Sequence, residues 1–234
     1  MGNIYSDLDV FIIRESNYFE NTNAEYIEKE RKTFFINLNN INLDVEVFNK
    51  DYVLNLSNEL KELKINKDVR IQNIISYDFK MTNEFLNRFL YSICIKNEHL
   101  YIDIKNNISY DNFFEYKKLL KLSLIDGVKL DITGNLSKSE IDTALYQFRN
   151  LIFIIFEIIL SKEKISVDRD KWIILKFMNF IKIENKYNNF YKIYLDFFRK
   201  DLSNENECSE RIKNSLPIVL RELEKSLFDE ELSI

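Results

Sequence analysis

Residues 6–13 read Ser-Asp-Leu-Asp-Val-Phe-Ile-Ile and place two acids at the N-terminal end of an apolar run. Side chains at positions i and i+2 of a strand share one face, so Asp7 and Asp9 are expected to project together. Two adjacent carboxylates repel each other unless a cation lies between them. Mg²⁺ is the predicted cation, with Mn²⁺ as its substitute, because hard cations favour carboxylate and phosphate oxygens. This stretch therefore predicts a metal-binding strand.

A second segment, residues 41–48, reads Ile-Asn-Leu-Asp-Val-Glu-Val-Phe and alternates apolar side chains with the acids Asp44 and Glu46. This period of two predicts a strand. Acids in mid-strand are unfavourable, so their face is expected to meet solvent or a metal. If this strand pairs beside the first one, Asp44 or Glu46 supplies a third carboxylate next to Asp7 and Asp9. Such a set can hold two Mg²⁺ ions and a nucleoside triphosphate.

The Ser-Asp-x-Asp pattern, followed about a helix later by a strand that carries an acid, resembles the nucleotidyltransferase superfamily that includes DNA polymerase beta. Within it, the pattern is most similar to the small bacterial branch related to aminoglycoside nucleotidyltransferases. The resemblance implies that Asp7 and Asp9 bind both metals and that a third acid binds one metal or acts as the base. Asp44 matches the third acid best, because it stands between two apolar residues, and Glu46 is a rival on the same face. Ser6 is the implied nucleotide contact beside the acid pair.

The family's Gly-Ser turn, which cradles the triphosphate through backbone N–H groups, would stand upstream of the acid pair. The sequence starts at Met1-Gly2, and its other glycines, Gly127 and Gly134, form no glycine-rich phosphate loop. We therefore expect either an additional upstream segment or an N-terminally shortened core with weakened or lost catalysis.

The hydrophobic patterns predict an α+β fold, with a small mixed sheet over residues 1–65 and helices over residues 66–234. The resemblance implies that the first region is a shortened nucleotidyltransferase core and the second a helical substrate or acceptor domain. The sheet is predicted from strands 8–14, 33–38 and 41–48, with Asn39-Asn40 as a hairpin turn, because Asn tolerates left-handed backbone angles. Residues 15–31 are polar and are predicted to form a solvated loop or a short helix, and 51–64 a helix.

The second domain is predicted to be largely helical, with His99–Ile104 as a short strand or connector. Ser137-Lys-Ser-Glu140 has the sequence of a capping box at the start of a buried helix. Further helices are predicted over residues 168–184, 188–200 and 209–228. Pro217 lies inside the last of these patterns and is expected to kink the helix or delay its start.

Lys171 and Trp172 form a second candidate feature, because the resemblance implies basic and aromatic groups that face the nucleotide cleft. Lys171 is the predicted nucleotide contact. The alternative interpretation places both residues at a helix N-terminus with Trp172 in the core.

Composition limits the classes of partner. The 234 residues carry a net charge of −5 and a pI near 5.2, which argues against a dedicated nucleic-acid binder. The most apolar stretch, Leu151–Leu160, contains Glu157 and is too short to span a bilayer, so we expect a core helix and no membrane. Without a signal peptide, the two cysteines, Cys94 and Cys208, are expected to be reduced thiols of a cytoplasmic protein.

The predicted reaction is Mg²⁺-dependent transfer of a nucleoside monophosphate, AMP from ATP, onto a hydroxyl of a small molecule or macromolecule. An exposed sheet edge is also expected, and three outcomes stay open for it: a homodimer formed through that edge, coverage of the edge by the polar segment 15–31, or instability of the chain alone. Two alternatives stay open: a catalytically inactive nucleotidyltransferase that binds nucleotides or proteins, and a helical interaction protein, such as an antitoxin or scaffold, in which the acids are incidental.

Overall fold

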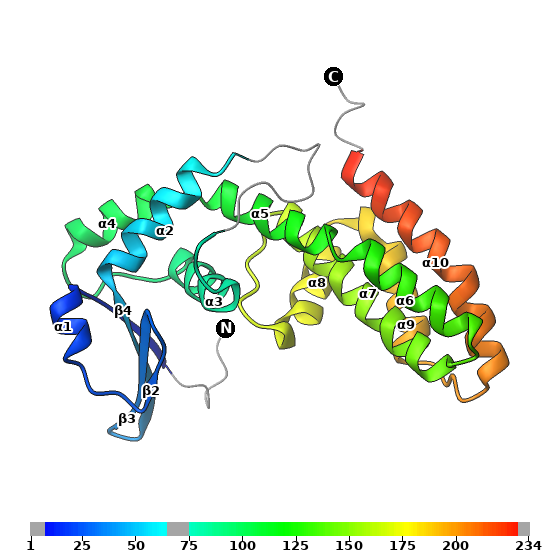
Figure 1. Cartoon of the computed structure of the whole chain (residues 1–234), viewed down its shortest axis with the longest axis horizontal. Coiled ribbons are helices and arrows are strands. Elements are labelled where there is room, and N and C mark those ends of the chain that lie inside the picture. The colour runs from blue at the N-terminus through cyan, green and yellow to red at the C-terminus, as the bar shows by residue number, and fades with distance from the viewer. Residues whose placement is uncertain (1–7, 65–74, 229–234) are drawn as a thin grey trace. The chain divides into compact units, whose positions relative to one another are not determined.

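The computed structural model describes residues 8–64 and 75–228, and over these residues the fold is α+β, as predicted. A four-stranded mixed sheet near the N-terminus is followed by nine helices, α2 to α10, in the described part of the chain (Figure 1). The chain forms two compact units. A sheet unit holds residues 1–63, 75–78 and 92–109, and a helical unit holds the rest. The predicted domain boundary at residue 65 adjoins residues outside the described ranges and stays a prediction.

The sheet has the strand order β1-β4-β3-β2. Its strands are β1 (Leu8–Arg14), β2 (Tyr26–Ile27), β3 (Arg31–Leu38) and β4 (Ile41–Asn49). β1 runs parallel to β4, whereas β3 is antiparallel to both β4 and β2. Asn39 and Asn40 turn the β3–β4 hairpin with φ angles of 51° and 66°, which confirms the predicted left-handed turn. The three strands predicted from the alternation are also confirmed.

The polar segment 15–31 is partly structured, because it contains the short helix α1 (Ser16–Glu20) and strand β2. Lys32 fixes it from β3. Its buried ammonium group donates to the carbonyl oxygens of Phe19, Glu20 and Thr22 at 2.7, 2.9 and 2.9 Å. The same nitrogen lies 4.9 Å from the centre of the Phe19 ring. A buried lysine thereby binds the carbonyl oxygens at the C-terminal end of α1, where helix carbonyls lack intrahelical partners.

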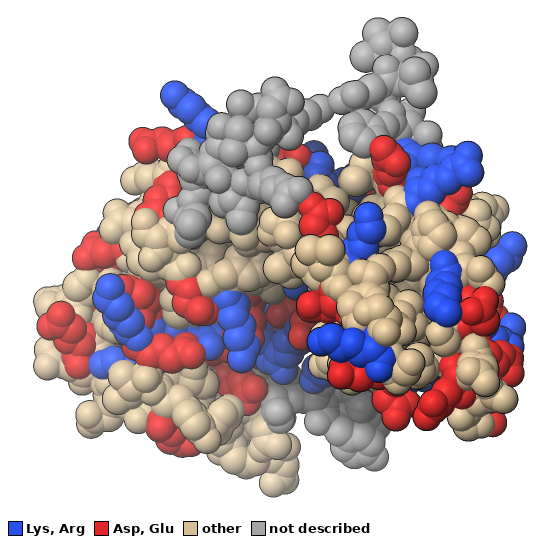
Figure 2. Space-filling model, turned by 45° about the vertical axis from the view of Figure 1, so that its right-hand side comes forward, with Lys and Arg blue, Asp and Glu red and all other residues tan. Residues whose placement is uncertain are grey.

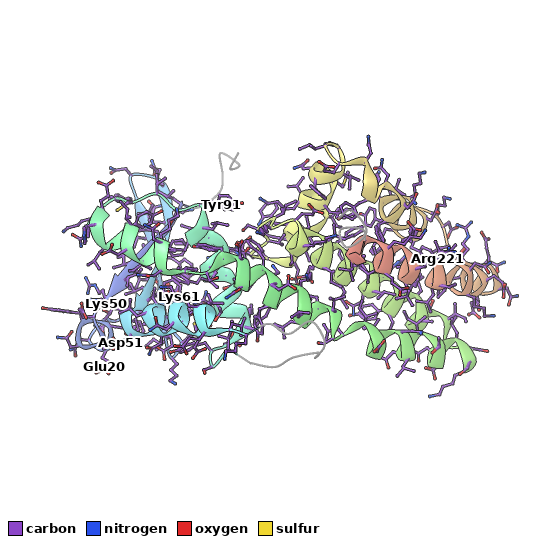
Figure 3. All side chains as sticks on the ribbon, turned by 90° about the horizontal axis from the view of Figure 1, so that it is seen from above. Glu20, Lys50, Asp51, Lys61, Tyr91 and Arg221 are labelled. Atoms are coloured by element: carbon purple, nitrogen blue, oxygen red, sulfur yellow. The ribbon has the colours of Figure 1, made fainter. Side chains whose placement is uncertain are left out.

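Helix α2 (Lys50–Glu62) begins where β4 ends, at the N-cap residue Asn49. The Asn49 side chain accepts hydrogen bonds from the Asp51 amide at 3.0 Å and from the Ser16 hydroxyl at 2.9 Å. Lys61, in the last turn, donates to the side-chain oxygen of Asn107 at 2.6 Å and so ties α2 to α4 (Figure 3). The predicted helix over residues 51–64 is confirmed, and its buried face contains Val53, Leu56 and Leu60.

The predicted strand at His99–Ile104 is wrong, because these residues lie in helix α4 (Glu98–Asn107). Only Ile104 of this helix is buried, so its apolar pattern is too weak to distinguish the helix period from the strand period. Tyr101 and Lys105, one turn apart, both hydrogen-bond the Ser92 carbonyl, and the Lys105 ammonium lies 5.1 Å from the Tyr101 ring centre. These contacts, which depend on helical spacing, hold the segment as a helix.

The helical unit is built around α7 (Ile141–Lys162), which contacts α5, α6, α8, α9 and α10. The helices besides α7 are α3 (Phe79–Leu90), α5 (Tyr110–Leu122), α6 (Ile125–Ser137), α8 (Ile173–Ile181), α9 (Asn188–Phe198) and α10 (Glu205–Phe228). Among the described helices α7 is long and apolar enough to cross a membrane, but 67% of its most apolar window is buried. Phe156 of α7 stacks on Phe177 with ring centres 3.8 Å apart. The helix is therefore the core of this unit, as predicted.

Two expectations about helix starts are wrong: a capping box at the start of α7, and the delayed start that was one of the two effects expected of Pro217. Ser137 closes α6 and donates to the Gly134 carbonyl at 2.7 Å, so the expected capping box does not start α7. Helix α7 instead starts after Glu140, whose side chain makes no capping hydrogen bond. Pro217 does not delay α10, which begins at Glu205 and runs through the proline. The Asn204 side chain accepts from the Glu207 amide at 3.0 Å, so a local cap sets that start.

A buried polar cluster joins α3 and α5 to the segment after α7. Lys117 of α5 is buried and donates to the Val167 carbonyl at 2.8 Å, while the Asn87 side chain accepts from the Val167 amide at 3.1 Å. Arg88 pairs with Asp168 at 3.0 Å. Desolvation by burial lowers the pKa of Lys117 to about 8, although the nearby Glu157 carboxylate acts in the opposite direction. This cluster fixes the segment that leads to Lys171 and Trp172.

Candidate functional site

Asp9 and Asp44 meet on one face of the sheet. They are register partners on the neighbouring parallel strands β1 and β4, so their side chains project to the same side. Adjacent strands lie about 4.8 Å apart, which places the two carboxylates within reach of one shared cation. Asp9 is exposed and Asp44 half-buried. The predicted adjacency of the two strands, with their acids on a common face, is confirmed.

Glu46 has a different environment, although it lies on the same face as Asp44. It is buried, and its Oε2 lies 3.7 Å from Nη1 of Arg31 on β3. Arg31 also donates from Nε to Glu28 at 2.5 Å. A carboxylate beside a guanidinium inside the sheet unit is held as an ion pair, which suits a structural role. The geometry therefore favours Asp44 over Glu46 as the acid that joins Asp9.

The same face changes character along the strands. From Glu46 onward it is aromatic: the half-buried Phe11, which is the register partner of Glu46, and the buried Phe48 have ring centres 6.0 Å apart, and Phe48 stacks on Tyr52 of α2 at 6.2 Å. Toward the hairpin it carries Asp9, Asp44 and the exposed ring of Phe35, which is the β3 partner of Asp44. The buried aromatic end anchors the sheet, and the hairpin end presents its acids to solvent.

Asp7 and Ser6 lie outside the described residues, so the structure does not place the first acid of the predicted set or the predicted nucleotide contact. Over residues 8–64 and 75–228, no three His, Cys, Asp or Glu side chains gather closely enough to hold a metal ion. Asp9 and Asp44 are thus a two-carboxylate site in the described part. Their donors are all hard oxygens, which fits Mg²⁺ when a nucleotide's phosphates complete the coordination shell.

Lys171 and Trp172 lie in a 3₁₀ turn (Asp170–Trp172) of the helical unit. Trp172 is 40% exposed, so the interpretation that buries it in the core is wrong. The Lys171 ammonium lies 5.0 Å from the Trp172 ring centre, which keeps cation and ring together at the surface. The acids belong to the other unit, and the role of Lys171 as a nucleotide contact stays a prediction.

The sequence interpretation missed two residues of this face, Phe35 and Arg31. A usable signal was present, because a two-residue hairpin turn fixes the register of its strands. With Asn39-Asn40 as the turn, Leu38 faces Ile41, and Phe35 then faces Asp44. Counting outward from the turn would have found Phe35 beside Asp44, but it pairs Arg31 with Phe48 and so does not reveal the Arg31–Glu46 ion pair.

Charge is mixed on the face of the molecule in Figure 2, where Lys and Arg side chains alternate with Asp and Glu. That pattern agrees with the net charge of −5 for the whole chain.

Comparisons with known proteins do not assign the chain to a family. No protein-family model, curated protein or solved structure matches this chain. The structure itself shows a small mixed sheet of four strands followed by helices over the described residues.

Proposed function

We propose that this chain is a Mg²⁺-dependent nucleotidyltransferase that moves a nucleoside monophosphate, AMP from ATP, onto a hydroxyl group of a small molecule or macromolecule. The observation that carries the proposal is the in-register placement of Asp9 and Asp44 at the exposed end of one sheet face. Like charges so close together favour the binding of a cation between them.

In this proposal Asp9 and Asp44 hold Mg²⁺, which when bound offsets the negative charge of the triphosphate and polarises its oxygens. The acceptor oxygen forms a bond to the α-phosphorus while the bond from that phosphorus to the β-phosphate oxygen breaks, and pyrophosphate leaves. In this proposal the hydroxyl proton passes to the Asp44 carboxylate as general base. Positioning and charge provide most of the catalysis in such reactions.

The test is calorimetric binding of α,β-methylene-ATP, which cannot release pyrophosphate, with and without Mg²⁺. Wild-type protein is expected to bind it in Mg²⁺ and at least about tenfold more weakly in EDTA, because the carboxylates alone repel the phosphates. Asp9→Asn and Asp44→Asn are expected to lose the Mg²⁺-dependent part of the affinity.

Asp103→Asn is the matched control, because Asp103 is an exposed acid of the same unit that pairs with His99 on α4. It is expected to bind the nucleotide like the wild type. Equal affinity in wild type, Asp9→Asn and Asp44→Asn would show that the two acids are not the nucleotide's metal site.

A further inference from the structure

An exposed aromatic pair continues the acid pair across the sheet. Phe35 on β3 is the register partner of Asp44, which is in turn the partner of Asp9. Tyr26 on β2 pairs with Thr33, two residues from Phe35, so it lies on the same face. The Tyr26 and Phe35 rings meet edge to face with centres 5.8 Å apart. One face thus presents, strand after strand, two carboxylates and then two rings.

Both rings remain open to solvent. Tyr26 is 63% exposed and Phe35 is 50% exposed. Aromatic surface left in water is unfavourable, and an edge-to-face pair still offers π surface to a third ring. The opposite face at the same strand positions carries Ile27 and Ile36, 68% and 43% exposed, which offer no such surface.

We propose that Tyr26 and Phe35 bind the acceptor, and that the acceptor carries its hydroxyl on an aromatic ring. This inference rests on the proposed function. Phe35 lies one strand, about 4.8 Å, from Asp44, so a ring stacked on it brings its own hydroxyl to that carboxylate. The base of the nucleotide fits the Tyr26–Phe35 pair less well than an acceptor ring does. A ribose separates the base from the phosphate that the acids would hold, whereas Phe35 lies directly beside those acids. The attacking hydroxyl is the other group that must come this close to them.

The experiment uses ¹⁹F NMR with 4-fluorophenol as the probe, in the presence of full-length protein, Mg²⁺ and α,β-methylene-ATP. Trifluoroethanol, which has a hydroxyl and no ring, is the reference probe. Wild type is expected to broaden the 4-fluorophenol signal and to leave the trifluoroethanol signal sharp. Phe35→Ala and Tyr26→Ala are each expected to weaken 4-fluorophenol binding about three- to tenfold.

Ile36→Ala and Ile27→Ala are matched controls, since each is the next residue in the chain, is similarly exposed and faces the other way. Both should broaden the probe like the wild type. Phe35→Leu removes the ring while keeping apolar bulk, and it should resemble Phe35→Ala even if the alanine variant folds poorly.

The two proposals fail in different ways. Equal broadening of 4-fluorophenol by wild type and Phe35→Leu, or equal broadening of both probes by wild type, overturns the acceptor site. Neither result bears on Mg²⁺-dependent nucleotide binding, which calorimetry measures separately. Loss of Mg²⁺-dependent nucleotide binding is expected in Asp9→Asn and in Asp44→Asn, and equal affinity in the wild type and both variants overturns the proposed function instead.

Discussion

Lys117 is a single residue that makes the stability of the fold depend on pH. Its ammonium group is buried in the helical unit, where desolvation lowers its pKa from 10.5 to about 8. Between these values the unfolded chain binds more protons at this residue than the folded chain does. Stability at this site therefore rises with pH across that window, and the full cost of the buried charge is felt below pH 8.

Replacing the residue should remove that slope. We expect the free energy of unfolding of the wild type to rise by roughly 2–3 kcal/mol from pH 7 to pH 10 relative to Lys117→Met, as the pKa difference implies. Urea unfolding followed by circular dichroism at both pH values measures it. Lys129→Met, at an exposed position of α6, is the control and should follow the wild type. Parallel pH profiles for wild type and Lys117→Met would contradict this account.

Residue by residue, the site could be predicted only in part. The Asp-x-Asp pattern and the alternation around Asp44 were enough to place Asp9 and Asp44 on one face, because both signals are local. The sequence did not decide between Asp44 and Glu46, because that choice depends on Arg31 of another strand. An ion pair across strands leaves no trace in the spacing of either strand's sequence.

At the scale of elements, the β3–β4 hairpin is the feature that the sequence predicts best. Asn39-Asn40 adopts left-handed angles that only a few residue types tolerate, so the residue types alone predict the turn. Helix α4 is the opposite case, with one buried side chain and a stability that comes from contacts to Ser92. Elements defined by a steep local preference are predictable, and those held by their neighbours are not.

The left-handed turn can be tested with one substitution, Asn to Gly, that should have opposite effects on stability at two positions. Asn40 has a φ of 66°, so Asn40→Gly should stabilise the fold by about 0.5 kcal/mol and Asn40→Ala should destabilise it by about 1 kcal/mol. Asn58, exposed in mid-α2, is the control, because glycine there should destabilise by about 0.5 kcal/mol. Urea unfolding of the three variants decides the matter. The same sign for Asn40→Gly and Asn58→Gly would refute the left-handed turn.

At the scale of the whole molecule, β1 is an end strand of the described sheet, with β4 as its neighbour. An edge strand offers its backbone to another chain, so we expect the protein to form a homodimer through β1. Leu8→Lys places a charge at the exposed start of that edge and should shift the protein toward monomer. Sedimentation velocity over a range of protein concentrations measures the equilibrium.

Leu54→Lys is the matched control, because Leu54 is an exposed leucine on α2, away from the edge. It should dimerise like the wild type. A wild type that sediments as a monomer at every concentration would rule out the edge as an interface.

The division of the chain between its units has a consequence for the order in which it is made. Residues 79–91 belong to the helical unit, and residues 92–109 return to the sheet unit. On the ribosome, all four strands emerge well before α4, which supplies the buried Ile104 and the contacts to α2. At about 5–20 residues per second, the nascent sheet waits several seconds for its last helix. Through that interval the apolar residues that α4 will cover are a natural substrate for chaperones.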